Sequence, residues 1–225
     1  MKLLALSDTH GTHLDITSDI YRILSENPDI DTIIHAGDGA NPKDPYMNSN
    51  KMVEFLEWYS SLPCSLKIYV PGNHDTSIEA NLINLKDYPE ITFLLHDSLR
   101  LEDGTRIFGS PYTPEFCNWA FNVPRDKLTR YWDIIPEDTD ILVTHGPPKY
   151  ILDATRGQSH GDLSLYKHVT ERIKPKVHIF GHFHDEFNHI NSGIRVLNGL
   201  HTRFINASIV DNRHKVVNIP TIVEV

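Results

Sequence analysis

The sequence predicts an α/β protein with two packed β-sheets and helices flanking them. Three observations support this fold class: short apolar runs recur along the chain, the first intervals between them have helical spacing, and the second half carries hairpin signals instead. The length of 225 residues, with 40% hydrophobic and 23% charged residues, allows a sizeable core. No repeat or composition break divides the chain, so residues 1–225 are expected to form one domain.

Five short apolar runs are each predicted to be a buried strand, because each run ends at a cluster of small or polar residues. They cover residues 3–6, 32–35, 67–70, 141–144 and 177–180.

Helices are predicted between the first three strands, because apolar residues repeat there with helical spacing. The first segment carries Ile16, Ile20, Ile23 and Leu24, and the second carries Met52, Val53, Phe55, Leu56 and Tyr59. Asp15, Thr17 and Ser18 are N-cap candidates for the first helix, and Pro28 marks its end. Strand, helix and strand in this order predict crossovers onto a parallel sheet.

The second half of the chain is predicted to be mixed. Asp103-Gly104 lies between two strand-like runs and indicates a hairpin over residues 99–107. A second hairpin is expected at residues 191–193, with short strands at 208–210 and 216–219 and helices near 125–132 and 163–173.

Polar blocks follow all five predicted strands. The blocks are Asp8-Thr9-His10, Gly37-Asp38, Gly72-Asn73-His74-Asp75, His145-Gly146 and Gly181-His182-Phe183-His184. Ligands bind at the carboxyl ends of strands in open α/β sheets, because the loops converge there. We therefore expect these side chains to share one site.

The residue types in these blocks suit divalent metal ions. Carboxylate oxygens, an amide oxygen and imidazole nitrogens are ligands for Mn, Fe, Zn, Ni or Mg, and no thiolate is among them. One Asp-x-His tripeptide alone is more often a surface loop, and one Gly-His-x-His alone is more often a turn with two exposed histidines. Five such blocks in order at one sheet edge favour a metal site instead.

The ordered blocks resemble the calcineurin-like metallophosphoesterase superfamily. The resemblance rests on Asp8-x-His10, Gly37-Asp38, Gly72-Asn73-His74-Asp75, His145 and Gly181-His182-x-His184. Further runs at residues 109–114, 121–125, 135–148 and 205–208 resemble the metallophosphoesterase-domain-containing, class III-like subgroup of phosphodiesterases. The likeness therefore extends over nearly the whole chain.

The resemblance implies a four-layer α/β/β/α sandwich that holds two divalent metal ions, with manganese favoured. It implies that Asp8, His10 and His184 hold one ion, that Asn73, His145 and His182 hold the other, and that Asp38 bridges them. It further implies that His74 is the general acid. The chain departs from the Ser/Thr protein phosphatase branch, because Gly39-Ala40-Asn41-Pro42 and Thr76-Ser77 replace the expected Asp-Arg-Gly and Arg.

The expected function is hydrolysis of a small phosphodiester, with cyclic nucleotides among the candidates. A hydroxide that bridges two cations would attack phosphorus while His74 protonates the leaving group. Asn73 and His74 would contact the substrate, and Arg156 would fork onto two phosphoryl oxygens. Asp75 either orients His74 or marks a helix start, and both interpretations stay open.

Aromatic and histidine residues outside the blocks receive structural interpretations. Tyr112, Phe116, Trp119 and Phe121 are more often loop packing than the lining of a substrate entrance. His35 and His178 are expected to be hydrogen-bonded core residues. The remaining histidines belong to no motif, and His201 is the first among them to consider for a functional role: His13, His96, His168, His189, His201 and His214.

Charge and hydropathy limit the partners of this chain. The net charge of −9 argues against an extended nucleic-acid surface. The apolar run near residue 1 is too short for a signal peptide or membrane span, so a cytoplasmic location and no membrane contact are expected. The sequence leaves the oligomeric state and the natural ester open.

Two other functional classes are compatible with this pattern. A phosphomonoesterase or a nuclease of the same fold would use the same site. The second class is a metal-stabilised protein-interaction module, since some proteins of this fold act as scaffolds. The presence of His74 beside all seven expected ligands favours an enzyme.

Overall fold

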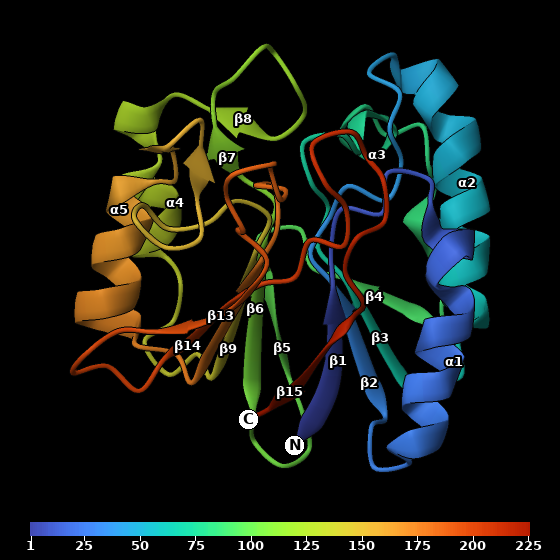
Figure 1. Ribbon diagram of the computed structural model, residues 1–225, viewed down its shortest axis with the longest axis horizontal. Coiled ribbons are helices and arrows are strands. Elements are labelled where there is room, and N and C mark those ends of the chain that lie inside the picture. Colours follow the sequence, from blue (N-terminus) through green and yellow to red (C-terminus); the bar gives the residue numbers. More distant parts are fainter.

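Two β-sheets form the centre of the computed structural model, which describes residues 1–225 (Figure 1). The first sheet contains β1 (Lys2–Leu6), β2 (Thr32–His35), β3 (Leu66–Tyr69), β4 (Ile91–Phe93) and β15 (Thr221–Glu224), in the spatial order β15-β1-β2-β3-β4. Strands β1 to β4 are parallel and β15 is antiparallel to β1. The expected crossovers onto a parallel sheet are therefore present.

The second sheet is mixed. It contains β5 (Asp97–Arg100), β6 (Arg106–Ser110), β9 (Ile141–Thr144), β12 (Val177–Phe180), β13 (Gly193–Val196) and β14 (Arg203–Asn206), in the order β13-β14-β12-β9-β6-β5. Two small pairs lie in its connections, namely β7 (Thr113–Pro114) with β8 (Asn122–Val123) and β10 (Ala154–Thr155) with β11 (Gln158–Ser159).

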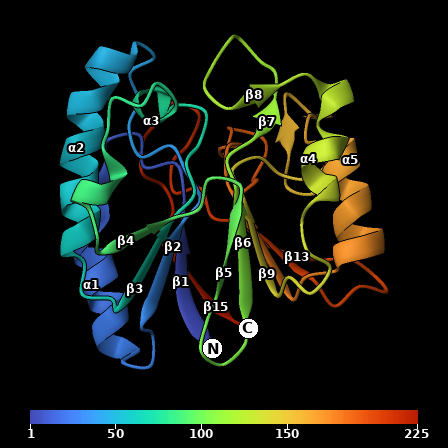
Figure 2. The same cartoon turned by 180° about the vertical axis from the view of Figure 1, so that it is seen from behind.

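Helices cover the outer face of each sheet (Figures 1 and 2). On the first sheet lie α1 (Thr17–Glu26) and α2 (Pro45–Ser61), while the short α3 (Thr76–Glu79) packs against α2 beyond the strand ends. On the second lie α4 (Thr129–Asp133) and α5 (Leu163–Lys167), which continues as a wider π-helical turn over His168–Ile173. The α2 helix begins with Pro45 after an N-cap, Asp44, whose carboxylate accepts hydrogen bonds from the Tyr46 and Met47 amides.

Three apolar layers hold the sheets and helices together. Leu3, Ile34, Val143 and Ile179 are fully buried between the two sheets. Ile20, Phe55 and Tyr59 fill the space between the first sheet and its helices, and Trp132, Leu165 and Phe180 fill the corresponding space beside the second sheet. The result is the expected four-layer α/β/β/α sandwich. Burial of strands on both faces explains why they appear in the sequence as continuous apolar runs.

Some expected elements differ from the structure. The hairpin predicted at residues 191–193 is wrong: β13 begins at Gly193 and pairs with β14, so the turn lies between Val196 and Arg203. The backbone near residue 191 turns because the Asp185 carboxylate accepts hydrogen bonds from the Asn191 and Ser192 amides.

The predicted strands at 208–210 and 216–219 are also wrong. Only single bridges occur there, Ser7 with Ser208 and Val210 with Val216, while the true last strand is β15. None of the three N-cap candidates of α1 caps it, because a 3₁₀ turn over His13–Ile16 leads directly into the helix. The Asp103-Gly104 hairpin is confirmed, since β5 and β6 pair around it.

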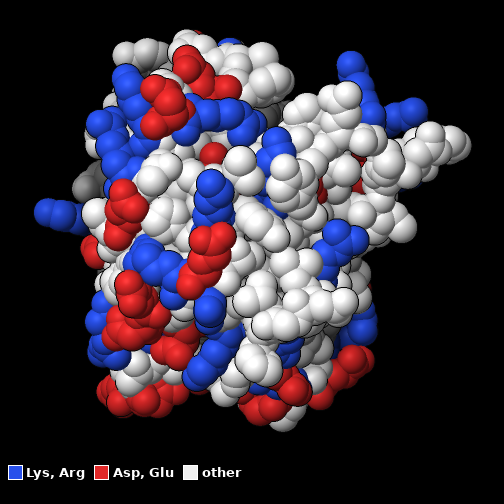
Figure 3. All heavy atoms as spheres, turned by 90° about the vertical axis from the view of Figure 1, so that its left-hand side faces the viewer, with Lys and Arg blue, Asp and Glu red and all other residues white.

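The helices of this molecule do not suggest a membrane-spanning segment, and the face shown in Figure 3 does not carry charge of a single sign. On the face that carries α4 and α5, basic and acidic side chains are interspersed (Figure 3). The helices are all too short or too polar to span a lipid bilayer.

Candidate active site

The loops after β1 and β2 run side by side and carry three of the expected ligands. Backbone hydrogen bonds join Asp8 N to Gly37 O at 2.9 Å and His10 N to Asp38 O at 2.9 Å. Asp8, His10 and Asp38 all have positive φ values, of 58°, 44° and 61°. Strained backbone of this kind concentrates at functional sites, where the surroundings hold it in place. The strain turns all three side chains inward, where they are at most 6% exposed.

Asp38 stands at the centre of the buried cluster. Its Oδ2 lies 3.3 Å from His145 Nε2 and 3.7 Å from His10 Nε2. Its Oδ1 accepts a 2.7 Å hydrogen bond from the His74 amide. Asp38 belongs both to a group with His10 and His74 and to a group with His145 and His182, in each of which the ligand atoms lie within 4.8 Å of one another.

The Asp8 carboxylate links the two sheets. It accepts hydrogen bonds from the His182 amide, the shorter at 3.0 Å, and its Oδ1 lies 3.2 Å from His184 Nε2. Gly181 makes this approach feasible, because a Cβ at that position would collide with the Asp8 carboxylate. Burial would raise the pKa of Asp8, but the hydrogen bond and charge of His184 lower it below the usual carboxyl value.

His145 and Asn73 complete the second half of the cluster. His145 Nδ1 donates to the Ala36 carbonyl at 2.8 Å, which directs Nε2 toward Asn73 Oδ1 at 2.9 Å. A carbonyl partner on the far nitrogen is the usual way to orient a metal-binding imidazole. Burial would lower the pKa of His145, but the Asp38 carboxylate raises it to about 9, whereas burial lowers that of His182 to about 3.

The donor set of this cluster fits divalent cations. Two carboxylates, one amide oxygen and four imidazoles converge there without any Lys or Arg ion pair to neutralise them. The nitrogens of His10 and His184 face each other at 3.2 Å. Close imidazoles and carboxylates are stable together when a cation lies between them. All seven expected ligands are therefore brought together.

His74 lies at the edge of the cluster and is half-buried. Its Nδ1 is 3.0 Å from the Asn41 carbonyl, which only accepts, so this nitrogen carries a proton and Nε2 is free. The Trp119 ring stacks on His74 at 3.9 Å between centroids. Trp119 is thus part of the site, contrary to the packing role that its sequence favours, whereas Phe121 is buried in the core as expected.

Of the two roles expected for Asp75, the helix start is confirmed, because Asp75 directly precedes α3 as its N-cap residue, whereas the orientation of His74 is wrong. Its carboxylate accepts hydrogen bonds from the amides of Asp38, Gly39 and Gly72 and from the Tyr69 hydroxyl. It makes no side-chain hydrogen bond to the start of α3 and none to His74. Asp75 therefore fastens the loop after β2 to the loop after β3. Burial and the nearby Asp38 charge raise the pKa of Asp75 to about 6.

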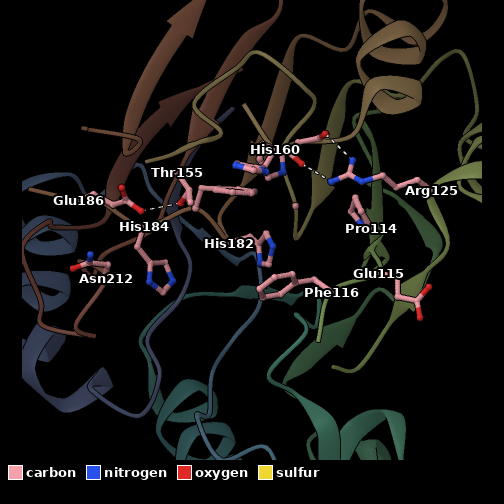
Figure 4. Close-up of a pocket in the computed structure, with 14 residues that line it drawn as sticks. Pro114, Glu115, Phe116, Arg125, Thr155, His160, His182, His184, Glu186 and Asn212 are labelled. Carbon is pink, nitrogen blue, oxygen red and sulfur yellow. Dashed lines mark hydrogen bonds between the residues drawn. The ribbon is translucent and has the colours of Figure 1, made fainter. Parts of the chain in front are cut away.

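A cavity of about 350 Å³ opens beside His182 and His184 (Figure 4). Phe116, which is 64% exposed, forms one wall, and Thr155 and Glu186 form another, joined by a 2.8 Å hydrogen bond. The Arg125 guanidinium donates to the carbonyls of His160 and Gly161 at the far end. Arg156 is exposed and is not among the lining residues, so the structure does not bring it to the cluster.

His214 is the residue that motif reasoning missed. Its ring stacks on that of His10 at 4.1 Å, although 204 residues of sequence separate them. No local signal marks it, because its place depends on how the segment after β14 folds back. The core roles expected for His35 and His178 are confirmed: His35 bonds Thr9 and the Gly37 amide, and His178 bonds Thr144.

Comparison with known proteins agrees with this geometry. Residues 1–186 match the family model described as calcineurin-like phosphoesterase. The chain belongs to that family. This phosphoesterase is 32% identical over 249 residues to metallophosphoesterase domain-containing protein 1 of Homo sapiens, with 99% of this chain and 70% of that protein covered.

Two further comparisons extend the family relationship. The phosphoesterase is 28% identical over 256 residues to the UPF0046 protein T07D4.2 of Caenorhabditis elegans, with 100% of this chain and 60% of that protein covered. Its fold is similar to the crystal structure of TT1561 of Thermus thermophilus, with a TM-score of 0.61, 16% identity, and coverage of 91% and 88% of the two chains.

Proposed function

We propose that this phosphoesterase hydrolyses a small phosphodiester, using two divalent cations and His74 as general acid. One observation carries the proposal: the Asp38 carboxylate lies 3.7 Å from His10 Nε2 and 3.3 Å from His145 Nε2, one histidine from each proposed ligand set, and also binds the His74 amide. A carboxylate shared between two groups is the arrangement that a pair of cations needs.

Seven residues would hold the cations in this proposal. Asp8, His10 and His184 would hold one, Asn73, His145 and His182 the other, and Asp38 both. When bound, such cations neutralise phosphoryl charge and make a water molecule acidic enough to act as nucleophile near neutral pH. Imidazole-rich sites suit manganese, iron, zinc or nickel, and manganese is the ion we favour.

His74 would deliver the proton that the departing alcohol needs. The Asn41 carbonyl holds its Nδ1 proton, and Trp119 covers one ring face, so Nε2 points away from both contacts. Its backbone amide binds Asp38, which keeps the imidazole at a constant distance from the cluster. Proton transfer from a positioned imidazole contributes roughly 10²–10⁴ to turnover.

The cavity beside His182 and His184 supports an ester that carries an organic group. Its walls include the exposed Phe116 ring and Phe183, surfaces on which an apolar or aromatic group could pack. A small diester, including a cyclic nucleotide, would place its phosphorus at the cluster and its organic part in the cavity. The replacement of the phosphatase-branch arginine blocks by Gly39-Ala40-Asn41-Pro42 and Thr76-Ser77 argues against phosphoprotein substrates.

The test is turnover of a matched pair of artificial substrates, one phosphodiester and one phosphomonoester, by metal-stripped protein. Manganese, nickel, zinc and magnesium are added separately, and cyclic nucleotides follow. We expect metal-dependent hydrolysis with preference for the diester, and no turnover by an Asp38→Asn control. Faster hydrolysis of the monoester, or activity that survives metal removal, contradicts the proposal.

A further inference from the structure

His214 lies on a tight turn that is built to present its side chain. The Asp211 carboxylate accepts hydrogen bonds from the Arg213 and Lys215 amides, and the His214 amide donates to the Asp211 carbonyl at 2.9 Å. These contacts hold His214 at a φ of 55°, in the left-handed region, where Asn, Asp and His are the most frequent residues after glycine. The turn thus fixes the direction in which the His214 side chain leaves the backbone.

The turn places the imidazole against the catalytic cluster. Its ring lies parallel to that of His10, with 4.1 Å between centroids and 7° between planes. The ring centroids of His184 and His74 are 5.5 Å and 6.2 Å away. One nitrogen of each of His10, His184 and His214 falls within a group whose members are at most 4.8 Å apart.

The imidazole of His214 has unused hydrogen-bonding capacity at this position. His10 and His184 nitrogens contact each other and His74 contacts Asn41, but no protein group bonds the nitrogens of His214. The side chain is half-buried, so it does not fill the core. A neutral imidazole offers one N–H donor and one acceptor. A ligand that occupies the cluster would meet that donor.

Two occupants could use these nitrogens, a cation or the substrate. Imidazoles that bind one ion aim their nitrogens at the same point, so their ring planes cannot lie parallel and face to face. The 7° angle between His10 and His214 therefore disfavours shared coordination. Stacking instead sets His214 beside a proposed ligand imidazole, at the cluster where the phosphoryl group would bind in the proposed reaction.

We propose that His214 is a further catalytic residue, which donates a hydrogen bond to a non-bridging oxygen of the phosphoryl group. This inference rests on the proposed phosphoesterase reaction. A preorganised donor acts where negative charge develops, and removal of one such donor costs roughly 10²–10³ in turnover. His74 and His214 then have different tasks, because one protonates the departing alcohol and the other binds an oxygen that stays on phosphorus.

The test uses His214→Gly, which removes the imidazole and relieves the left-handed backbone, so that folding is not impaired. His214→Asn tolerates the same backbone and keeps an N–H donor, and His201→Ala changes an exposed histidine away from the cluster as a matched control. Three quantities are measured for each manganese-loaded protein: bound metal, the affinity for inorganic phosphate by calorimetry, and kcat/KM for the diester.

We expect His214→Gly to retain its metal, to bind phosphate at least tenfold more weakly and to lose about 10²-fold in kcat/KM. His214→Asn should recover part of both losses, and His201→Ala should equal the wild type. Loss of metal in His214→Gly identifies a metal ligand and overturns the inference, as does unchanged phosphate affinity. If the wild type hydrolyses neither ester, the proposed function fails, while phosphate affinity still decides the role of His214.

Discussion

Asp38 and His74 have separable roles at the residue scale, although their side chain and backbone touch at 2.7 Å. Asp38→Asn should abolish metal binding and turnover together, because the neutral amide cannot be shared between two cations. His74→Asn should keep the metal and slow turnover by about 10²–10⁴. Metal content by elemental analysis and kcat on the same samples check both. Equal behaviour of the two variants would refute the assignment.

Trp119 should act through His74. Stacking contacts of this kind are worth about 1 kcal/mol, so Trp119→Ala should reduce turnover roughly fivefold while Trp119→Phe changes it little. The loss should be larger for an alkyl diester than for a nitrophenyl diester, because only the alkoxide needs a proton to depart. The ratio of the two kcat values is the measurement. An equal loss for both substrates would mean that Trp119 serves only packing.

The residues that the sequence singles out lie together in the structure where chemistry and local order coincide. The seven expected ligands and His74 each follow an apolar run, and their spacing within Asp8-Thr9-His10 or Gly181-His182-Phe183-His184 carries the information. Trp119 and His214 have no such signal, because their positions depend on loops that return from other parts of the chain. The sequence places Asp75 in the correct block but does not predict its hydrogen-bond partners. Those partners are buried backbone amides, and a sequence does not indicate which amides will face a carboxylate.

At the element scale, the end of β12 depends on one glycine. A Cβ at Gly181 would collide with the Asp8 carboxylate and the Ser7 side chain, both of which belong to the end of β1. Gly181→Ala should therefore push the two sheet edges apart and weaken metal binding at least tenfold with little loss of secondary structure. Calorimetric titration with manganese and far-ultraviolet circular dichroism test this. Gly104→Ala, at a solvent-exposed hairpin turn, is the control; retained manganese affinity in Gly181→Ala contradicts the account.

The β12 strand also carries a buried base that should respond to pH. Burial lowers the pKa of His178 to about 3, so the folded state keeps it neutral while the unfolded chain takes up a proton near 6.5. Its contribution to stability is present above pH 6.5 and is lost as the pH falls toward 3.

Relative to His178→Gln, the metal-free wild type should lose about 1.4 kcal/mol of unfolding free energy between pH 7.5 and 5.5. Urea unfolding of both proteins at the two pH values measures this difference. A constant difference between the proteins would contradict the neutral, buried state of His178.

Elements were predicted best where both faces are covered. Strands β1, β2, β3, β9 and β12 lie between two apolar layers, so their sequences are uniformly apolar. The strands of the two main sheets that were missed, β4, β14 and β15, lie near sheet edges or carry polar residues such as Arg203 and Glu224. The false strand at 216–219 arose because Val216, Val217 and Ile219 are β-branched, although only Val216 pairs, in a single bridge to Val210. Whether a segment finds a neighbouring strand to pair with depends on the tertiary fold, and the local sequence pattern does not specify it.

At the scale of the whole molecule, the site is a junction between the two sheets. Asp8, His10, Asp38 and Asn73 extend from the first sheet, and His145, His182 and His184 from the second. Contacts such as Asp8 with His184 and Asp38 with His145 therefore join halves of the sandwich that the sequence keeps far apart. The four-layer architecture brings these strand ends to one edge, which is why the motifs that predict the fold also predict which side chains lie close together.

The most direct test of the account is anomalous X-ray scattering from a crystal of this protein loaded with manganese. The account predicts two peaks roughly 3.5–4 Å apart on either side of the Asp38 carboxylate, with Asp8, His10 and His184 around one and Asn73, His145 and His182 around the other. A single peak, or peaks outside this cluster, would contradict it.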